Sequence, residues 1–431
     1  MKNFSIARLG LALALGATLT ACSSTPDDNL PPSDQQAPGS ENRPVLSARE
    51  AENFVPARWF LSLNKEEAPW TPADITLPQQ PDFVVGPANG EGVTHTTLQA
   101  AVDAAIVKRS SRRQYIAVMP GEYPGTVYIP AASNSVTIYG TGETADAVKI
   151  GLALDSEIDV NTWRRTVNPG GKYMPGKPSW YMFDTCQRQR SATVGIMCSA
   201  AVWSQNNGLQ LQNLTIQNTL GDSVDAGDHH AVALRSDGDN VQINKVNLLG
   251  RQNTLFVTNS DIRNRMLDDR LTRTLVTNSY LEGDVDIVAG RGAVVFNNDT
   301  FRVVQTRTQR EGYVFAPATP AALSFGFLAE NSRFIAEGDG VAKLGRAWDL
   351  GVAEGSYSPG QSPNGQVVIR TSTISKNFNQ KQPWGDALDS GRPYAGNIGN
   401  GTNDNNEPQR DLNDPAFNRL WEFHNSVQDS E

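Results

Sequence analysis

Short apolar segments alternate with polar turns over most of this chain, and the segments repeat one local pattern. In each copy an Asn lies three positions before an apolar residue, within a segment rich in Val, Ile, Leu and Thr. The clearest copies are residues 213–216, 278–281, 298–301 and 331–334, and weaker ones include residues 246–248 and 373–374. Turns rich in Gly and Asp, such as residues 237–239 and 283–284, separate the copies. This pattern predicts many short strands connected by turns.

The copies recur at uneven intervals of about 20 to 40 residues, which is the range found in repeat proteins. We therefore predict an all-β parallel β-helix, a single solenoid domain over residues 51–431. In such a domain each coil stacks on the previous one, and inward side chains form a continuous apolar core. The Asn side chains would then form ladders inside the stack. A β-sandwich or a propeller also has short strands, but neither explains the recurring Asn positions as well.

One segment, residues 97–108, has the periodicity of a helix. Its apolar residues fall on one stripe, namely Leu98, Ala101, Val102, Ala105 and Ile106. Because this helix precedes the repeats, we predict that it caps the N-terminal end of the β-helix and covers an exposed sheet edge. After about residue 376 the chain is polar and rich in Gly until residues 417–423, which we expect to pack back along the coils.

The N-terminus has the pattern of a bacterial lipoprotein signal peptide. Lys2 and Arg8 precede an uncharged apolar run over residues 9–19, which is too short for a transmembrane helix. The run ends in Leu19-Thr20-Ala21-Cys22, which matches a lipobox, the motif whose Cys sulfur receives a diacylglycerol. We predict a signal peptide over residues 1–21 and a lipid on the Cys. An ordinary signal peptide that happens to carry a Cys is the alternative.

The residues after the predicted cut indicate where the protein is held. Ser23 follows Cys22, whereas an Asp there signals retention in the inner membrane, so we expect a lipid anchor in the outer membrane. Residues 22–50 are rich in Ser, Pro, Asp, Asn and Gln, and we predict that they form a flexible tether. Nothing after residue 22 resembles a membrane span, so anchoring would rest on the lipid.

The net charge indicates which classes of partner to expect, and the cysteine content indicates a disulfide. Removing residues 1–21 takes away Lys2 and Arg8 and changes the formal net charge from −9 to −11, so we expect no nucleic-acid partner. We also expect a monomer. With Cys22 lipidated, Cys186 and Cys198 remain, and in an oxidising compartment we predict that they form a disulfide. A reactive thiol is the alternative, but no His is near either Cys in the sequence.

The sequence indicates neither a metal site nor a serine hydrolase. The four His, at positions 95, 229, 230 and 424, show no metal-ligand spacing with Cys or carboxylates. The chain also has no Gly-x-Ser-x-Gly motif. We therefore expect no metal and no organic cofactor. On composition alone the adjacent His229 and His230 would be a surface pair, which leaves carboxylates and Arg on short strands as the candidate groups.

Five motifs occur in a characteristic order. They are Gly121-Glu122-Tyr123, Ala231-Val232-Ala233-Leu234, Gly250-Arg251-Gln252-Asn253-Thr254-Leu255, Gly283-Asp284-Val285-Asp286-Ile287-Val288-Ala289-Gly290 and Leu344-Gly345-Arg346-Ala347-Trp348. With them the chain resembles the pectin methylesterases, the aspartyl esterases of carbohydrate esterase family 8, from about residue 82 to 375. Each motif alone is weak, but five in order are specific. The resemblance implies a right-handed parallel β-helix of the pectin lyase type, which agrees with the repeats.

The resemblance implies roles for four side chains. Asp286 would be the nucleophile that attacks an ester and forms an acyl-enzyme. Arg346 would keep Asp286 ionised and oriented, because a nearby cation favours the carboxylate. Gln252 would donate to the oxyanion, and Trp348 would stack on a sugar ring. The structural alternative for Asp286 and Arg346 is a buried ion pair that only stabilises the fold.

The chain also departs from the family's motifs. The family's second Asp, the general acid that protonates the leaving methanol, falls on Asn253, and losing a positioned acid typically costs roughly 10²–10⁴-fold in rate. A second oxyanion donor, normally Gln, falls on His230. Arg251 replaces a Tyr, and Ile287 and Ala289 replace two Phe that shape the sugar groove. We therefore expect weak or absent activity on pectin.

Three functions remain open. The first is an ester hydrolase with a changed substrate, in which Asp286 attacks and His230 replaces the lost acid. The second is a thioester hydrolase, for example on acyl-CoA, because a thiolate leaves without needing a proton. Acyl-CoA is cytoplasmic, however, and the lipobox predicts export. The third is a non-catalytic envelope protein that binds glycans. The expected partners are thus the outer membrane, through the lipid, and a polysaccharide or a small ester.

Overall fold

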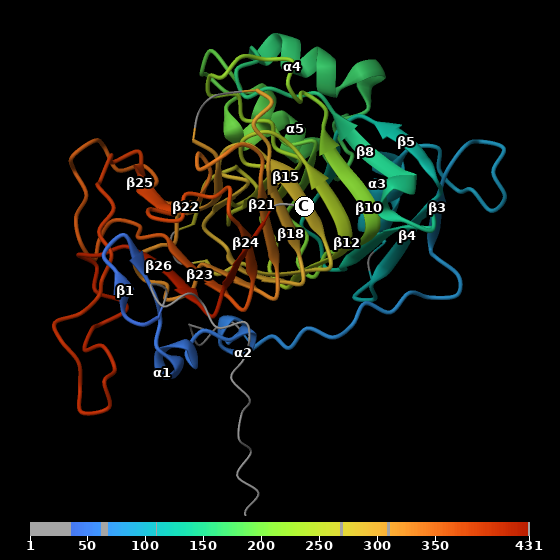
Figure 1. Ribbon diagram of the computed structural model, residues 1–431. Helices are drawn as coiled ribbons and strands as arrows, with labels where there is room; N and C mark the ends of the chain where they lie inside the picture. Colours follow the sequence, from blue (N-terminus) through green and yellow to red (C-terminus); the bar gives the residue numbers. More distant parts are fainter. Residues whose placement is uncertain (1–35, 62–67, 109, 268–269, 308–310, 430–431) are drawn as a thin grey trace, which may run out of the picture.

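The computed structural model describes residues 36–429, apart from residues 62–67, 109, 268–269 and 308–310 (Figure 1). The predicted signal peptide, the predicted lipidation site Cys22 and the first part of the predicted tether lie outside the described residues. Within the described part of the chain, no helix is long and apolar enough to cross a membrane.

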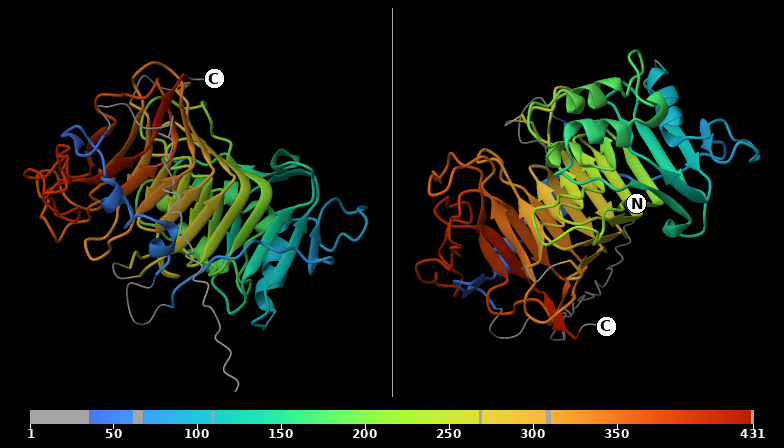
Figure 2. Two further views of the ribbon diagram at one scale, coloured as in Figure 1. Left: turned by 60° about the horizontal axis from the view of Figure 1, so that its bottom comes forward. Right: turned by 90° about the horizontal axis from the view of Figure 1, so that it is seen from above.

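Most of the described chain winds into a right-handed parallel β-helix whose strands stack in three rows (Figures 1 and 2). The first row consists of β3 (Phe83–Val85), β4 (Gln114–Val118), β7 (Val136–Gly140), β10 (Gln210–Asn218), β12 (Val241–Leu249), β14 (Arg273–Thr277), β17 (Ala293–Asn297), β20 (Phe327–Glu330), β23 (Gln366–Arg370) and β26 (Arg419–Phe423). The second row shares β10 and β12 and adds β5 (Gly121–Pro124), β8 (Val148–Leu152), β15 (Tyr280–Gly283), β18 (Thr300–Val303), β21 (Arg333–Ala336), β24 (Thr373–Ser375) and β27 (Ser426–Gln428). The third row is a separate sheet of β6 (Val127–Ile129), β9 (Val202–Ser204), β11 (Leu234–Ser236), β13 (Leu255–Val257), β16 (Val288–Gly290), β19 (Tyr313–Pro317), β22 (Lys343–Trp348) and β25 (Trp384–Leu388). The predicted parallel β-helix is therefore confirmed.

The interior of the coils is the main hydrophobic core. Val, Leu, Ile and Phe side chains from all three rows point inward and are almost fully buried. Five Phe rings in the C-terminal half form a cluster with centroid distances of 4.9 to 6.5 Å and mostly tilted or edge-to-face contacts, namely Phe296, Phe301, Phe315, Phe327 and Phe334. Burying each ring contributes about 1.5–3 kcal/mol, so the cluster holds successive coils together.

The recurring Asn residues lie at bends between strands. Asn213, Asn278, Asn298 and Asn331 have φ angles of 53 to 61°, a left-handed conformation that Asn adopts more readily than most residues. The last three are exposed, and Asn298 Nδ2 donates to Asn278 Oδ1 of the preceding coil at 2.7 Å. The predicted ladder inside the stack is therefore wrong, because the bend turns these side chains toward solvent.

The residue after each bend forms the buried polar ladder instead. Asp299 Oδ1 accepts from Ser279 N at 2.7 Å, Ser332 Oγ accepts from Asp299 N at 3.1 Å, and Ser372 Oγ accepts from Ser332 N at 3.0 Å. Asn425 Oδ1 continues the ladder to Ser372 N at 3.1 Å. Burial raises the pKa of Asp299 well above its usual range. Each bend thus satisfies a backbone N–H that the core would otherwise leave unpaired.

The predicted cap is confirmed. Helix α3 (Leu98–Val107) begins after Thr97, whose side chain accepts from Ala100 N. The helix packs against β3, β4 and β6 at the N-terminal end of the coils, and its buried stripe joins the main core. The expected packing of residues 417–423 along the coils takes a different form, because β26 pairs in register with β23 and continues the first row.

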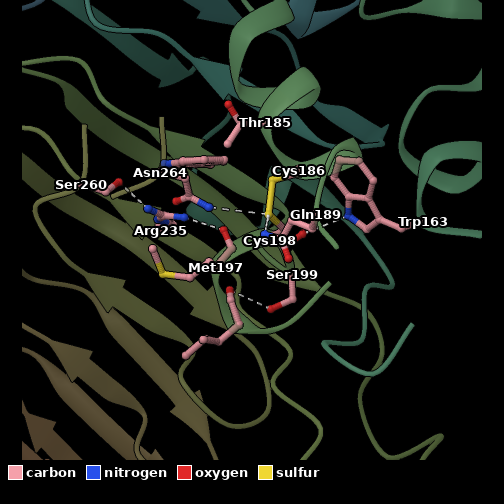
Figure 3. Close-up of a disulfide and its surroundings, with 12 residues drawn as sticks. Trp163, Thr185, Cys186, Gln189, Met197, Cys198, Ser199, Arg235, Ser260 and Asn264 are labelled. Atoms are coloured by element: carbon pink, nitrogen blue, oxygen red, sulfur yellow. Dashed lines mark hydrogen bonds between the residues drawn. A yellow bond between two sulfur atoms is a disulfide. The ribbon is translucent and has the colours of Figure 1, made fainter. Parts of the chain in front are cut away.

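Residues 153–201, between β8 and β9, form an insertion that lies over the N-terminal part of the third row (Figure 2). It contains helices α4 (Val160–Val167) and α5 (Trp180–Gln187) and the 3₁₀ turns η3 (Pro169–Gly171) and η4 (Ile196–Cys198). The predicted disulfide is confirmed between Cys186 and Cys198, whose Cα atoms are 5.9 Å apart. Next to it, Arg235 of β11 donates to the Met197 carbonyl at 2.5 Å and ties the insertion to the third row (Figure 3).

The predicted tether is wrong for residues 36–50, which pack on the last coils. They form an antiparallel pair, β1 (Gly39–Ser40) with β2 (Arg43–Pro44), and enter α1 (Ala48–Ala51). The Arg43 Nε atom lies 2.7 Å from Glu422 Oε1 in a pair whose side chains are only 6% and 2% exposed. Further on, α2 (Pro56–Trp59) buries Trp59. Elsewhere, the 3₁₀ turn η2 (Ala145–Ala147) directly precedes β8. The composition of residues 36–50 is polar, but Arg43, Val45 and Leu46 are buried, and this burial fixes the segment.

Candidate active site

The register of the third row brings the predicted site residues together. Strands β13, β16 and β19 pair in parallel and in register. Asn253, Asp286 and Tyr313 therefore occupy equivalent positions on three successive coils, with neighbouring strands about 4.8 Å apart. Gln252, Asn253 and Asp286 have φ angles of 48, 61 and 50°. Non-glycine residues in this left-handed region are uncommon and cluster at functional sites.

Asp286 and Arg346 form a bidentate ion pair. Arg346 Nε donates to Asp286 Oδ1 at 2.9 Å, and an Arg346 terminal nitrogen donates to Oδ2 at 2.7 Å. The Asp286 residue is 2% exposed. Burial alone would lower the pKa of Arg346, but the adjacent Asp286 carboxylate raises it above its ordinary value. The Arg346 guanidinium also lies 4.0 Å from the centre of the Tyr313 ring, which fixes its plane.

Asn253 and His230 form a second pair beside the first. The Asn253 Oδ1 atom contacts His230 Nδ1, and Asn253 Nδ2 lies 3.4 Å from the Asp286 carbonyl oxygen. The His230 backbone N–H donates to Ser156 Oγ at 3.1 Å, and the His230 carbonyl accepts from Ser156 N at 3.1 Å. His230 is therefore held on one side by the site and on the other by the insertion, which the sequence did not indicate.

Gln252 is 4% exposed and lies next to the Asn253–His230 pair. Its Nε2 atom is 3.4 Å from Asp228 Oδ1, a long contact, and among the described residues its Oε1 atom has no hydrogen-bond partner. The amide is therefore buried at the site with little of its hydrogen-bonding capacity used. Such a group can turn its N–H toward a substrate oxygen, as an oxyanion donor must.

Trp348 lies two residues beyond Arg346 on β22 and is partly exposed. Its Nε1 atom donates to Asp389 Oδ2 at 3.0 Å, and its ring centre is 6.1 Å from that of Phe256 on β13. The neighbouring Ala289 is fully buried. The ring is thus fixed in the third row near the ion pair, where a bound substrate could reach its face.

Two residues that the sequence reasoning did not select organise this site. Asp284, interpreted from the sequence as part of a turn, accepts from Gln252 N at 2.8 Å through Oδ1. Arg307 Nε donates to Asp284 Oδ2 at 2.8 Å, and an Arg307 terminal nitrogen donates to the His229 carbonyl at 3.3 Å. Both side chains are almost fully buried, at 0% and 1% exposure. The pair therefore fixes the backbone on both sides of the site.

His229 points away from this arrangement. Its Nδ1 atom is 2.7 Å from Asp155 Oδ2 and its Nε2 atom is 3.1 Å from Asp225 Oδ1. The two adjacent His therefore differ in their surroundings, since only His230 contacts Asn253. Among the described residues, no group of three His, Cys, Asp or Glu side chains could hold a metal ion.

Comparison with known proteins shows to which family this chain belongs. A family model described as Pectinesterase matches residues 183–350. Pectinesterase B of Dickeya dadantii is 44% identical over 97% of this chain and 97% of its own length. The chain belongs to the pectinesterase family.

Two further relatives bear on this member of the pectinesterase family. An Escherichia coli protein named "Putative acyl-CoA thioester hydrolase YbhC" is 64% identical over 99% of this chain and 97% of its own length. The crystal structure of the rice weevil pectin methyl esterase superimposes with a TM-score of 0.80 at 34% identity, over 92% of this chain and all of that one. The names of these relatives thus include both oxygen-ester and thioester chemistry.

The buried Asp284–Arg307 pair yields a prediction about positioning. Arg307→Lys keeps the positive charge but cannot reach both Asp284 and the His229 carbonyl with planar, fixed donors. For any ester that the protein hydrolyses, we expect kcat to fall about 10- to 100-fold with little change in KM, because the site groups shift while the groove remains. Steady-state kinetics measure this.

The matched control is Arg302→Lys, because Arg302 pairs with Glu337 at 2.8 Å on an exposed part of the surface. That variant should leave kcat unchanged. A loss confined to KM in Arg307→Lys, or equal losses in the two variants, would contradict the positioning role.

Proposed function

We propose that this protein is an ester hydrolase of the pectinesterase type with little activity on pectin itself. In this proposal Asp286 is the nucleophile and His230, oriented by Asn253, carries out proton transfer. The observation that supports it most strongly is the bidentate Asp286–Arg346 pair, at 2.9 and 2.7 Å, beside a buried amide with unused hydrogen-bonding capacity. A pair that only stabilised the fold would not need Gln252 and His230 next to it.

The first step would be attack by an Asp286 carboxylate oxygen on the carbonyl carbon of the substrate. A new carbon–oxygen bond forms, the carbonyl oxygen takes up negative charge, and the Gln252 N–H donates to that oxyanion. Collapse of the intermediate breaks the bond to the leaving group and leaves the acyl group on Asp286. Arg346 holds the attacking carboxylate in place and keeps it ionised until it has reacted.

The Asn253–His230 contact determines which proton transfers are available. An amide oxygen can only accept, so His230 Nδ1 must carry the hydrogen in this contact. In the neutral ring Nε2 is then a bare acceptor. It can take a proton from the water that hydrolyses the mixed anhydride between the acyl group and Asp286, with Asn253 orienting the ring. A neutral ring cannot at the same time give a proton to a leaving alkoxide.

This arrangement favours leaving groups that depart as stable anions. A methoxide needs a proton as it leaves, whereas a thiolate or an aryl oxide does not. Thioester hydrolysis is therefore our second candidate, supported by Asn253 and by the name of the Escherichia coli relative. A non-catalytic glycan-binding protein is the third, and it is the conclusion that complete absence of turnover would support.

We also propose that the protein is lipid-anchored in the outer membrane, on the basis of the lipobox at Cys22 and the Ser23 that follows it. Cells that express the protein should incorporate labelled palmitate into it, and Cys22→Ser should abolish the label. The label should appear in the outer-membrane fraction. Persistent labelling of Cys22→Ser, or label in the inner membrane, would contradict the anchor.

The leaving-group argument predicts a clear substrate order. The purified protein in detergent should hydrolyse aryl esters and acyl thioesters faster than it releases methanol from methylated pectin, because only methanol release needs a general acid. Asp286→Ala should reduce turnover at least about 10³-fold, and His230→Ala by about 10²–10⁴-fold.

The adjacent His229 gives the matched control, since His229→Gln changes a residue that does not contact Asn253 and should leave turnover nearly unchanged. Circular dichroism shows whether each variant is folded. Turnover that survives in folded Asp286→Ala would place the chemistry elsewhere. Family-like rates of methanol release by the wild type would contradict the weak activity on pectin.

Asn253→Asp should restore the missing acid. We expect it to raise methanol release from pectin by about 10²-fold or more, because the carboxylic acid can protonate the leaving group. Thioester hydrolysis should not rise, since a thiolate needs no proton. Equal increases for both substrates would contradict the assigned role of position 253, and no increase on pectin would show that the groove no longer accepts the polymer.

A further inference from the structure

A pocket lies at the N-terminal end of the β-helix, away from Asp286. Its volume is about 450 Å³, within the usual range for small-molecule sites. It lies between the start of α3, strands β5 and β6 and the segment that follows α4. Its apolar walls come from six side chains, namely Pro87, Leu98, Pro120, Tyr123, Pro124 and Val127. The Gly-Glu-Tyr motif forms part of this lining, although it has no role at Asp286.

The pocket contains one cationic group. Lys172, contributed by the insertion, lines the pocket and donates from Nζ to the Thr126 carbonyl at 2.6 Å and to Thr126 Oγ1 at 3.4 Å. Nζ also lies 4.8 Å from the centre of the Tyr173 ring. Among the described residues no carboxylate lies within ion-pair distance of Nζ. Burial lowers the pKa of Lys172 to about 8, and the carboxylate of Asp103 on α3 offsets only part of this shift.

The surroundings of Lys172 are rigid and polar. Gln99 accepts from Tyr128 N at 2.7 Å and donates to the Tyr128 carbonyl at 3.0 Å, so its side chain is fixed in both directions. Thr126 Oγ1 is 2.7 Å from the Tyr173 hydroxyl. The N-terminal turn of α3 contains no acidic residue and faces the same space. Of the residues that the structure describes, Glu122 is the one acidic residue that lines the pocket, and it is exposed.

The pocket is separate from the candidate active site. Gly125 lines the pocket just before β6, and Asn253 lies just before β13. The parallel register makes these two positions equivalent, and β9 and β11 lie between the two strands. Three strand spacings correspond to about 14 Å. At the equivalent positions before β9 and β11, Ala200 and Val232 are buried, at 3% and 0% exposure. A ligand in this pocket would therefore not contact the catalytic groups.

We propose that this pocket binds a small organic carboxylate with a compact ring-sized body. The carboxylate would accept from Lys172 Nζ, which has no carboxylate within ion-pair distance among the described residues, and the body would contact the Pro side chains and Tyr123. The Lys172 amine can pair with one carboxylate of a ligand, and the apolar walls favour a ligand that is otherwise uncharged. Aromatic acids and sugar acids share this chemistry.

Calorimetric titration of the intact protein tests the proposal. The probes are benzoate and D-galacturonate, each compared with its uncharged counterpart, benzamide or D-galactose. At least one acid should bind, and its counterpart should bind at least tenfold more weakly. Affinity should fall as the pH rises through about 8, because the ammonium loses the charge that holds the carboxylate. Which acid binds identifies the body as aromatic or sugar.

Variants make the test specific. Lys172→Met should weaken binding at least tenfold and remove its pH dependence, whereas Lys172→Arg should retain most of the affinity. The matched control is Lys381→Met, an exposed lysine that does not line the pocket, and it should bind like the wild type. Asp286→Ala should also bind normally, so loss of catalysis and loss of this site are distinguishable. Circular dichroism confirms folding.

Three results would overturn the proposal. They are failure of both acids to bind at millimolar concentration, equal binding of an acid and its uncharged counterpart, and unchanged affinity in folded Lys172→Met. If Lys172→Met does not fold, reductive methylation of the wild type decides the matter. Benzoate or galacturonate should protect Lys172 from modification but leave Lys381 reactive, and equal reactivity of Lys172 with and without ligand would exclude binding there.

Discussion

The in-register parallel pairing of the third row is the constraint on which the candidate site depends. Residues separated by about one coil in sequence become neighbours about 4.8 Å apart, so Asn253 and Asp286 lie side by side. Arg346 then reaches Asp286 from β22, two strands further along. A one-residue shift in register would turn each of these side chains to the opposite face and separate the ion pair. The apolar core prevents such a shift, since the same register keeps Val and Leu inside.

We propose that two departures from the family's motifs act together on this scaffold. Asn253 cannot donate a proton as an Asp can, but its amide oxygen contacts the His230 ring, and the resemblance places His230 where the family has an oxyanion donor. In the proposed mechanism the site uses Asp286 as its nucleophile, lacks a general acid and has His230 as a positioned base. Asp284 accepts from the backbone N–H of Gln252, next to Asn253, and Arg307 donates to the backbone carbonyl of His229, next to His230.

Much of the fold could be predicted because its signals are local. The Asn-led repeats predicted the coils, the stripe from Leu98 to Ile106 predicted α3, and the two remaining Cys predicted the disulfide. Contacts distant in sequence were missed. Arg43 pairs with Glu422, 379 positions away, so a polar segment interpreted as a tether is packed on the domain. Likewise Arg307 lies outside the five motifs and Asp284 was interpreted as part of a turn, so only the folded chain shows that they meet. The Asn ladder was placed on the wrong side because spacing does not reveal a left-handed bend.

The central claim is that Asp286 becomes acylated, and intact-mass spectrometry tests it most directly. In His230→Ala the first step should proceed with an aryl ester or thioester, while the base that hydrolyses the acyl-enzyme is absent. The account predicts a mass increase of one acyl group, located in the peptide that contains Asp286 and absent in the Asp286→Ala, His230→Ala double variant. Turnover without any such adduct, or an adduct on another residue, would contradict it.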